Sequence, residues 1–568
     1  MAIQNKLKTP AEAAALVKDG DTVGINAFLS LANPEALHRA LAERIEKTGA
    51  PKNLEIFCAT GCGGWDENLF ADRYIKIDGA VRCVVAGHWS SMPAAGRMAS
   101  EGKIEGYNMP LGVMTHMQRA AAGKKPYILS DIGLNTFVDP RQDGAGLNAR
   151  SRAKWVELIQ IDGRDTLLYR TPKIDVAFIR GTTADPAGNI SFEKECVTVD
   201  ALSLAQATRN NGGKVIVQVE RLGDGYARPR NVIVPGILVD VVVVCPEQEQ
   251  IQSSAYNPSL SGDIHVAPAD MAYWIQKLPA TGNREREPEN ISHKIIGLRA
   301  ARELRAGDVV NLGIGIPEYV GHAAAETGIL DQITLTVESG GIAGLPAPGV
   351  AFGATIGADV ITNTSEQFDF YDGGGLDSCF LGAFEIDAAG NVNAHRLPGR
   401  IAGIGGFANL SQRTKNVIFT CNFTSGGLVV KREGGRVTIV KEGRFGKFVK
   451  AVHGISYSAK NGILNGQNVL YITERCVFRL TPDGLLLTEV ADGIDLKTQI
   501  LDLLPFKPKL AATIKTMEGV SGVSPLSMLS TAKGGGLPLS IRQTVKNVKG
   551  ASGGSPLSIR QGAKNVKK

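Results

Sequence analysis

Residues 333–338 read ITLTVE, and the glycine-rich residues 339–344, SGGIAG, follow at once. An apolar, β-branched run of this length predicts a buried strand, and the glycines mark a place where the backbone must come close to something else. The run ends on Glu338, and a carboxylate at the carboxyl end of such a strand lies where open α/β sheets bind their ligands. Position alone leaves two interpretations of Glu338 open, a functional carboxylate and a surface residue at a strand end.

A second glycine-rich segment lies just upstream. Residues 307–312 (GDVVNL) predict another strand, and residues 313–318 (GIGIPE) predict a glycine loop that leads into a helix opened by Pro317. Such a loop leaves N–H groups free above the helix start, where they can meet an anion or a carbonyl oxygen. The loop lacks the third glycine of a dinucleotide-binding fingerprint and the lysine of a P-loop, so it is a weak indication of function by itself.

The chain repeats itself at the scale of a domain. The order Gly-Asp, strand, Pro-Glu occurs at residues 20–35 and again at 307–318, and the segments 175–189 and 377–391 have identical spacing. Two copies of one α/β unit explain these matches best. We therefore expect an α/β protein of two tandem, similar open domains, residues 1–283 and 291–517, with a charged linker at 284–290 and with Glu338 facing a cleft between them.

The repeat also isolates Glu338. When residues 54–61 (LEIFCATG) are aligned with 333–340 (ITLTVESG), Ala59 falls on Glu338, so only the second copy has a carboxylate there. A residue that merely ended a strand would have no reason to differ between the copies. The asymmetry favours a functional role for Glu338.

Composition and charge narrow the possible classes of protein. The chain has 568 residues, 43% of them hydrophobic, which is enough for at least two substantial cores. The net charge of +6 is not spread evenly along the chain. Residues 519–568 hold eight Lys or Arg and no acidic residue, which leaves a net charge of −2 on residues 1–518. Low complexity and a repeated PLSIRQ motif predict a disordered basic tail over residues 518–568. We expect an inert extension, although such a tail can also contact nucleic acid or an acidic surface.

Other features argue against membrane, secreted and metal-binding proteins. No apolar stretch is long enough to span a membrane and no signal peptide is recognisable at the N-terminus, so we expect a cytoplasmic location. The eight cysteines and eight histidines are scattered, and Cys58 with Cys62 has no second pair to complete a metal site. We therefore expect no bound metal.

Several longer motifs resemble the family I coenzyme A transferases, and within them the single-chain acetate/propionate (acyl-CoA:acetate or 3-ketoacid) CoA-transferases. The resemblance covers about residues 9–510. It rests on the segments 105–113 (EGYNMPLGV), 136–141 (TFVDPR), 235–240 (PGILVD), 335–338 (LTVE), 367–377 (QFDFYDGGGLD), 404–407 (IGGF) and 471–475 (YITER). Together these segments are highly specific.

The resemblance implies that Glu338 is a nucleophile. Its carboxylate would attack an acyl-CoA thioester to give an acyl-glutamyl anhydride, and the released thiolate would then form a glutamyl-CoA thioester that an incoming carboxylic acid takes apart. A carboxylate can become both anhydride and thioester, so the residue type fits this chemistry. Each tetrahedral intermediate places negative charge on an oxygen, which backbone N–H groups can stabilise.

The other site residues that the resemblance implies are glycines and one leucine. They are Gly403, Gly405 and Gly406 for the oxyanion and CoA, Gly313 and Gly315 in a CoA-binding loop, and Leu111, Gly112, Gly340 and Gly341 in the substrate pocket. For Gly405 and Gly406 an ordinary tight turn stays open as an alternative.

Three features depart from the family pattern, one of them the absence of a basic residue that is usual near Gly446. Leu111 stands where members usually have Gln, and residues 340–344 (GGIAG) replace the usual Gly-Pro-Ile-Gly-Gly, with Gly341 for proline and Ala343 for glycine. These changes leave the nucleophile intact but put substrate identity and rate in doubt. An apolar Leu111 would suit a bulkier acceptor than acetate.

The resemblance implies coenzyme A, acyl-CoA and carboxylic acids as substrates, no permanently bound cofactor, no nucleic-acid or membrane partner, and a homo-oligomer. Three other functions stay open. A nicotinamide-dependent oxidoreductase would use the Gly313 loop, but no acidic ribose-binding residue is convincingly placed after it. An acyl-CoA hydrolase would differ only by admitting water to the glutamyl thioester, and a CoA-sensing protein would bind without turnover.

Overall fold

The structure is a computed structural model that describes residues 3–518, apart from residues 153, 253, 268–269 and 279–289. Almost all of the predicted linker, 284–290, and of the predicted tail, 518–568, lies outside the described residues. The linker, the tail and the domain boundaries therefore stay predictions.

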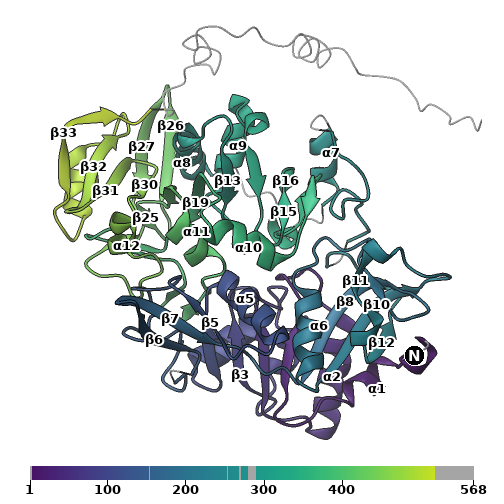
Figure 1. The fold of residues 1–568 in the computed structure, drawn as a ribbon. Helices are drawn as coiled ribbons and strands as arrows, with labels where there is room; N and C mark the ends of the chain where they lie inside the picture. Colours follow the sequence, from purple (N-terminus) through teal and green to yellow (C-terminus); the bar gives the residue numbers. More distant parts are fainter. Residues whose placement is uncertain (1–2, 153, 253, 268–269, 279–289, 519–568) are drawn as a thin grey trace, which may run out of the picture. The chain divides into compact units, whose positions relative to one another are not determined.

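The strands of the first half form one large sheet. Its parallel strands lie in the order β4-β3-β2-β1-β8-β10-β12, and β9 and β11 pair antiparallel at the end of β8. The bounds are β1 (Thr22–Ile25), β2 (Leu54–Cys58), β3 (Val81–Ala86), β4 (Glu105–Asn108), β8 (Val176–Ala184), β9 (Ile190–Ser191), β10 (Lys214–Leu222), β11 (Val232–Val234) and β12 (Val241–Val244). The chain builds outward from β1 to one edge and later from β8 to the other, so the strand order changes direction between β1 and β8. Figure 1 labels β3 of the first group and β8, β10 and β12 of the second.

The second half forms a second sheet on the same plan. Its order is β18-β15-β14-β13-β19-β24-β30-β31-β32-β33, and the central strands from β14 to β30 are parallel. The bounds are β13 (Val309–Leu312), β14 (Thr334–Thr336), β15 (Gly341–Ile342), β18 (Val360–Ile361), β19 (Ser378–Gly382), β24 (Asn416–Thr420), β30 (Asn468–Ile472), β31 (Cys476–Thr481), β32 (Gly484–Val490) and β33 (Lys509–Thr516). Here the order changes direction between β13 and β19. The fold is mixed α/β with parallel sheets, as the sequence predicts.

Helices and small sheets complete the two halves. The helices are α1 (Pro10–Ala14), α2 (Glu35–Thr48), α3 (Asp72–Ile75), α4 (Pro93–Ser100), α5 (Leu111–Ala122), α6 (Ala201–Asn210), α7 (Met271–Gln276), α8 (Ile291–Ala300), α9 (Glu318–Thr327), α10 (Thr364–Asp372), α11 (Phe407–Arg413), α12 (Ala459–Leu464) and α13 (Leu496–Gln499). The strands of the small sheets are β5 (Tyr127–Ser130), β6 (Val156–Ile161), β7 (Arg164–Arg170), β16 (Leu345–Pro346), β17 (Thr355–Ile356), β20 (Glu385–Asp387), β21 (Val392–Asn393), β22 (Arg396–Leu397), β23 (Arg400–Ile401), β25 (Thr424–Ser425), β26 (Val429–Glu433), β27 (Arg436–Lys441), β28 (Phe445–Gly446) and β29 (Phe448–Val449).

The internal repeat extends to single hydrogen bonds. The Asp175 carboxylate accepts a hydrogen bond from the Thr22 N–H at 3.0 Å, and the Asp377 carboxylate accepts one from the Val309 N–H at 3.0 Å. In the first half this bond joins the start of β1 to Asp175, which directly precedes β8. In the second half it joins the start of β13 to Asp377, which directly precedes β19. Two copies of one unit are the simplest origin of such a match.

The strand register confirms the alignment that isolates Glu338. The pairing of β1 with β2 and that of β13 with β14 have the same register, so Glu55 and Thr334 occupy equivalent places. Counting four residues on from each reaches Ala59 in the first half and Glu338 in the second.

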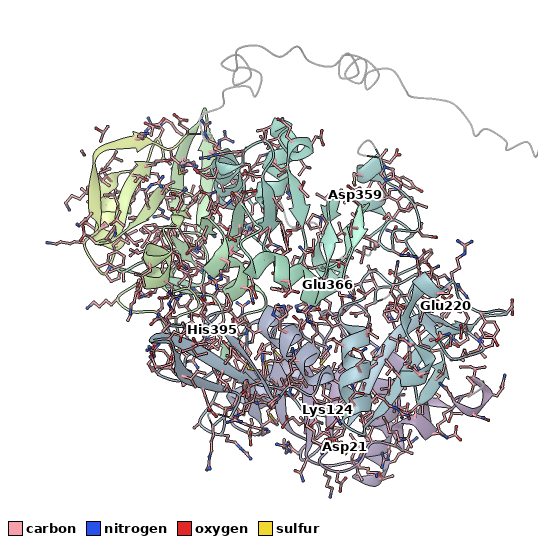
Figure 2. The ribbon with its side chains drawn as sticks, in the orientation of Figure 1. Asp21, Lys124, Glu220, Asp359, Glu366 and His395 are labelled. Carbon is pink, nitrogen blue, oxygen red and sulfur yellow. The ribbon has the colours of Figure 1, made fainter. Side chains whose placement is uncertain are left out.

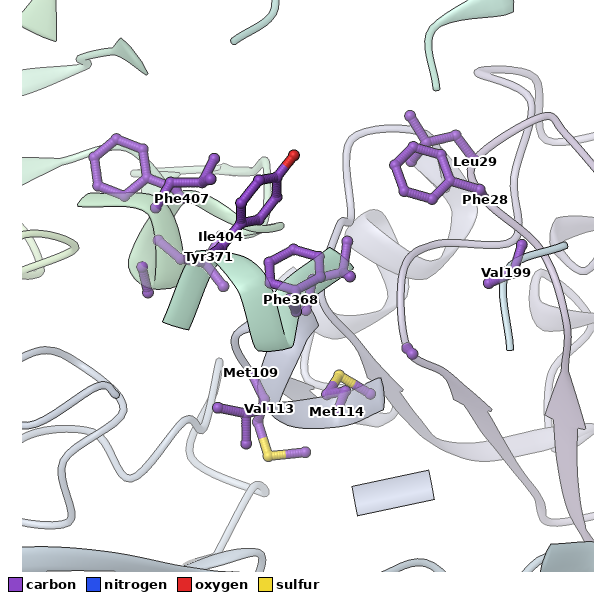
Figure 3. Close-up of a cluster of buried hydrophobic side chains, with 14 of the residues drawn as sticks. Phe28, Leu29, Met109, Val113, Met114, Val199, Phe368, Tyr371, Ile404 and Phe407 are labelled. Atoms are coloured by element: carbon purple, nitrogen blue, oxygen red, sulfur yellow. The ribbon is translucent and has the colours of Figure 1, made fainter. Parts of the chain in front are cut away.

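The halves pack together through a shared apolar core. Figure 3 shows part of it, with Phe28, Leu29, Met109, Val113, Met114 and Val199 from the first half and Phe368, Tyr371, Ile404 and Phe407 from the second. Nearby, the rings of Phe137 and His395 stack with centroids 3.8 Å apart, and Figure 2 labels His395 at this junction. Burial lowers the pKa of His395 to about 3, so its ring is neutral.

Within residues 3–518, wherever the structure describes the chain, no helix combines the length and apolar character that a membrane span requires.

Candidate active site

Glu338 lies in a tight turn directly after β14. The sequence predicts that the strand runs to Glu338, but β14 ends at Thr336. The chain turns there because the Gly340 N–H donates to the Val337 carbonyl at 3.0 Å. Glu338 is half-buried and stands at the carboxyl end of a parallel strand, the edge at which open α/β sheets bind ligands.

The carboxylate of Glu338 lies against the backbone of Gly406. A β-carbon on Gly406 would stand 2.7 Å from Cδ of Glu338 and 2.9 Å from each of its carboxylate oxygens, so no other residue fits without moving the carboxylate. Burial raises the pKa of Glu338 to about 7, and a hydrogen bond from the Gly406 backbone acts in the opposite direction. Of the predicted glycines, Gly406 is therefore the one in direct contact with Glu338.

The first half of the chain holds the loop that contains Gly406. The Gly405 N–H donates to the Gly87 carbonyl at 2.8 Å, and the Ile404 N–H donates to Oδ1 of Asn108 at 2.9 Å. Gly403 has φ +81, and a β-carbon on it would stand 2.5 Å from the Trp89 nitrogen. Gly403 is needed for a left-handed turn and for a close approach to the first half.

Leu111 and Gly112 meet the same loop from the start of α5. The Leu111 N–H donates to the Gly405 carbonyl at 2.9 Å, and the Leu111 side chain is buried. A β-carbon on Gly112 would stand 2.3 Å from the Phe368 ring and 2.6 Å from the Asn409 amide nitrogen. Both residues thus lie where the halves join, and Leu111 holds the loop through its backbone.

At Gly340 and Gly341, directly after the turn, neighbouring segments leave no room for a side chain. Gly340 has φ +115, and a β-carbon there would stand 2.0 Å from the Thr362 carbonyl oxygen. A β-carbon on Gly341 would stand 2.1 Å from Oγ1 of Thr355. These glycines let two further segments approach the turn that carries Glu338.

The loop of Gly313 and Gly315 is built differently from the prediction. The Gly313 N–H donates to the Phe380 carbonyl at 2.9 Å, and the Gly315 N–H donates to Oε1 of Glu318 at 2.9 Å. The expectation that these N–H groups are free is therefore wrong for both glycines, because Glu318 reaches back from the first turn of α9 and β19 lies alongside. The loop does lie at the direction change of the second sheet, beside β13.

Three buried polar groups near Glu338 carry no sequence signal that singles them out. They are Oδ1 of Asn311, Nε2 of Gln367 and the Tyr371 hydroxyl, and none of the three makes a hydrogen bond of good geometry with a described residue, although the Asn311 and Gln367 side chains lie close enough to act on the hydroxyl. Burial raises the pKa of Tyr371, and the charge of Glu338 raises it further, which places the hydroxyl within electrostatic range of the carboxylate.

Metal-ligand clusters are missing from the described part of the chain, where no group of three or more His, Cys, Asp or Glu side chains could hold an ion.

A family model for coenzyme A transferase matches residues 7–245 and 294–424. The chain is 41% identical to an acetate CoA-transferase, YdiF, of Escherichia coli (strain K12), over 84% of this chain and 88% of that protein. It is 38% identical to a caffeate CoA-transferase of Acetobacterium woodii, over 90% of this chain and 96% of that protein.

Solved structures agree with these sequence relatives. The crystal structure of the apoenzyme of the acyl-CoA transferase YdiF from Escherichia coli O157:H7 matches with a TM-score of 0.84 and 37% identity, over 92% of this chain and 97% of that one. A YdiF structure described as a thioester complex with CoA matches with a TM-score of 0.83 and 36% identity, over 92% and 98% of the two chains.

A resemblance first suggested by short motifs thus extends over most of the chain in sequence and in three dimensions: the chain belongs to the coenzyme A transferase family and is a CoA-transferase.

Proposed function

We propose that Glu338 carries coenzyme A between two carboxylic acids as a glutamyl-CoA thioester. The observation that carries this proposal is the contact between its carboxylate and the Gly406 backbone, in a setting that raises its pKa to about 7. Covalent acyl transfer needs a nucleophile and a hydrogen-bond donor for the oxyanion. Here the partly desolvated carboxylate can act as the nucleophile, and the backbone N–H beside it can act as the donor.

Each step exchanges one bond for another. A Glu338 oxygen attacks the acyl-CoA carbonyl, the carbon–sulfur bond breaks, and CoA leaves as its thiolate. The thiolate sulfur then attacks Cδ of Glu338, and the anhydride releases the first acid as its carboxylate. The acceptor carboxylate attacks the same Cδ, and the carbon–sulfur bond breaks, which releases the thiolate and leaves a new anhydride. The thiolate then attacks the acyl carbonyl of the acceptor, which forms the new acyl-CoA and frees the Glu338 carboxylate. No proton is gained or lost over the cycle.

The remaining residues of the proposed site contribute backbone groups and determine the shape of the site. The Gly406 N–H is placed to stabilise the oxygen that becomes negative at Cδ, with Gly403 and Gly405 shaping its loop. We assign CoA to the loop of Gly313 and Gly315. Gly340 and Gly341 follow Glu338 directly, and Leu111 and Gly112 lie at the start of α5, where Leu111 contacts the loop of Gly406. We assign these four residues to the space for the acyl groups.

An acceptor screen tests this function. The enzyme is incubated with acetyl-CoA and one acid at a time, including acetate, propionate, butyrate and a hydroxycinnamate, and the acyl-CoA products are identified by mass. We expect new acyl-CoA species only when an acid is present, with larger acids favoured by the apolar Leu111. Loss of acetyl-CoA without any acceptor would identify a hydrolase, and tight binding without turnover a CoA-sensing protein.

We also infer a homo-oligomer, because the resemblance to family members implies one, and a cytoplasmic location, which the sequence pattern favours. Light scattering on the purified full chain tests the assembly, and a monomer at micromolar concentration would contradict it.

A further inference from the structure

Two cations lie against one aromatic ring just after the carboxyl end of β19. The guanidinium carbon of Arg400 lies 5.4 Å from the centroid of the Phe384 ring, and Nζ of Lys447 lies 5.7 Å from it. Phe384 is half-buried and stands two residues after β19 ends at Gly382, and its N–H donates to the Asn393 carbonyl at 2.8 Å. This backbone bond holds the ring beside both cations.

In the described part of the chain, neither cation forms an ion pair with a carboxylate. Arg400 is exposed, and its side chain makes no hydrogen bond there, only the contact with the ring. Lys447 is half-buried and donates to the Ala383 carbonyl at 3.1 Å, which leaves two of its three donors for a ligand. Burial lowers the pKa of Lys447, and the charge of Arg400 lowers it as well, so an anion bound beside both would offset these two effects.

Glu385 is the carboxylate that acts on Lys447, and it is already engaged. It accepts from Nδ2 of Asn393 at 2.8 Å and from the His453 N–H at 2.9 Å, and it lies 2.6 Å from Nδ1 of His453. Cys421 also lies within electrostatic range, but it keeps its proton near neutral pH, because burial raises the pKa of its thiol to about 12. The two cations therefore leave an excess of positive charge beside the ring.

This positive site lies on the same edge of the second sheet as Glu338. Glu338 follows β14, the loop of Gly313 follows β13 and Phe384 follows β19, and these three strands are neighbours in this order. Since neighbouring strands are about 4.8 Å apart, Phe384 lies roughly 10 Å along this edge from Glu338. A β-carbon on Gly382 or on Gly405 would meet no atom within 4 Å beyond its chain neighbours, so both leave room for a narrow ligand.

Coenzyme A carries its charge far from its reacting atom. Its thiol, which the proposed reaction transfers to Glu338, and its phosphates lie at opposite ends of the flexible pantetheine arm. The N–H groups of Gly313 and Gly315 are engaged within the protein, so these two glycines supply no donor for the phosphates. Guanidinium and ammonium groups are well suited to phosphate oxygens, and they stand one strand further along the edge.

We propose that Arg400 and Lys447 bind the phosphate groups of coenzyme A, with the pantetheine arm passing Gly382 on its way to Glu338. This inference rests on the proposed function, because it adds a recognition site for the part of the substrate that does not react. Arg400 offers paired donors in one plane, and Lys447 offers a compact charge. Binding at this remote point holds the thioester at the carboxylate, so both residues contribute to specificity for CoA over shorter thiols.

Comparing acetyl-CoA with S-acetylpantetheine, which has the same thioester and no phosphate, tests this site on the full-length enzyme with propionate as acceptor. We expect Arg400→Gln to lower the ratio of kcat/KM for acetyl-CoA to kcat/KM for acetylpantetheine about tenfold, the loss of a hydrogen bond to a charged group. Lys447→Met should lower the same ratio. Arg436→Gln is the matched control, since it removes an exposed arginine charge on β27, and it should leave the ratio unchanged.

Binding of the free thiols separates this proposal from the covalent mechanism. Glu338→Ala cannot form the proposed thioester, yet calorimetry on this variant should show tighter binding of CoA than of pantetheine, with a smaller difference once Arg400→Gln is added. This result does not depend on whether an adduct forms on Glu338. The proposal is overturned by an unchanged ratio in Arg400→Gln, by equal affinity of Glu338→Ala for the two thiols, or by a loss confined to dicarboxylic acceptors such as succinate, which would assign the cations to the acceptor.

Discussion

A carboxylate that attacks a thioester must be ionised, yet it gains reactivity when protein replaces its water. At Glu338 both requirements, ionisation and loss of water, depend on the contact between its carboxylate and the Gly406 backbone. Burial raises its pKa to about 7, and the Gly406 backbone limits the rise. Near neutral pH a substantial fraction of the free enzyme is therefore ionised and poorly hydrated at once.

The raised pKa predicts the pH dependence of the first step. Only the carboxylate form can attack, and the proton leaves as the pH rises through the pKa of about 7, so kcat/KM for acyl-CoA should increase from about pH 5.5 and level off above about pH 8. Circular dichroism over the same range controls for unfolding. A flat profile with an intact fold would show that Glu338 keeps an ordinary pKa.

Ala343 carries backbone strain that the family's usual glycine would not. Its φ is +62, in the left-handed region where a β-carbon costs about 1–2 kcal/mol. Ala343→Gly should raise the free energy of unfolding by about 0.5–1 kcal/mol, after the entropy that glycine adds to the unfolded chain. Urea denaturation measures this, and Ala347→Gly, at a buried position without a positive φ, should lower it. Equal losses in both variants would contradict the argument.

At the scale of elements, the segment that joins β4 to α5 acts as the support for the loop of Gly403 to Gly406. Asn108, the last residue of β4, accepts from Ile404 and donates to the carbonyls of Ala86 and Gly87 at 3.0 and 2.6 Å. One side chain thus joins the end of β3 in the first half to one loop of the second.

Removing this bridge should impair the chemical step. Asn108→Ala leaves the Ile404 N–H without its acceptor and takes one of two donors from each of the Ala86 and Gly87 carbonyls, which keep the Trp89 ring N–H and the Gly405 N–H. A displacement of the Gly406 loop by about 1 Å can lower kcat about 10²-fold. Asn148→Ala is the matched control, since its amide also joins two carbonyls, those of Ala99 and Ile104, but away from the loop. We expect similar losses of stability in both variants and a large loss of kcat only in the first. Equal kcat values would show that the loop keeps its place without Asn108.

Sequence reasoning succeeded where a short pattern determines the local structure. The register that isolates Glu338 follows from strands and turns repeated within each half, and a carboxylate in one copy only is visible without a structure. It failed where distant side chains intervene. The bond between Asn108 and Ile404 spans 296 positions, so the support of the loop could not be predicted. The bond from the Gly315 N–H to Glu318 is a different case, because it spans three positions and belongs to a local pattern at a helix start that the sequence interpretation missed.

At the scale of the whole molecule, the two halves share one apolar core, and among the described residues the last strand of the second sheet is β33 (Lys509–Thr516). The Met517 N–H still bonds the Val490 carbonyl at 2.8 Å. The described chain thus reaches Glu518 directly after the last strand of this sheet that the structure describes.

A truncation after Glu518 should preserve turnover. It removes eight positive charges and no acidic residue, so acceptor-dependent activity should stay within about a few-fold while retention on an anionic column falls, since such retention follows basic charge. Full-length protein at matched concentration is the control. Loss of folding or of activity would show that residues 519–568 are structural.

Trapping the covalent adduct tests the central claim most directly. The enzyme is incubated with acyl-CoA and no acceptor, digested, and searched by mass for a peptide that carries coenzyme A. We expect the adduct on the peptide containing Glu338, no adduct and no exchange in Glu338→Ala, and exchange lower by about 10²-fold in Glu338→Asp, which withdraws the carboxylate by one methylene. Borohydride should inactivate the wild type only after acyl-CoA has been added. Full exchange in Glu338→Ala, or an adduct on Glu366 or Glu385 instead, would contradict the account.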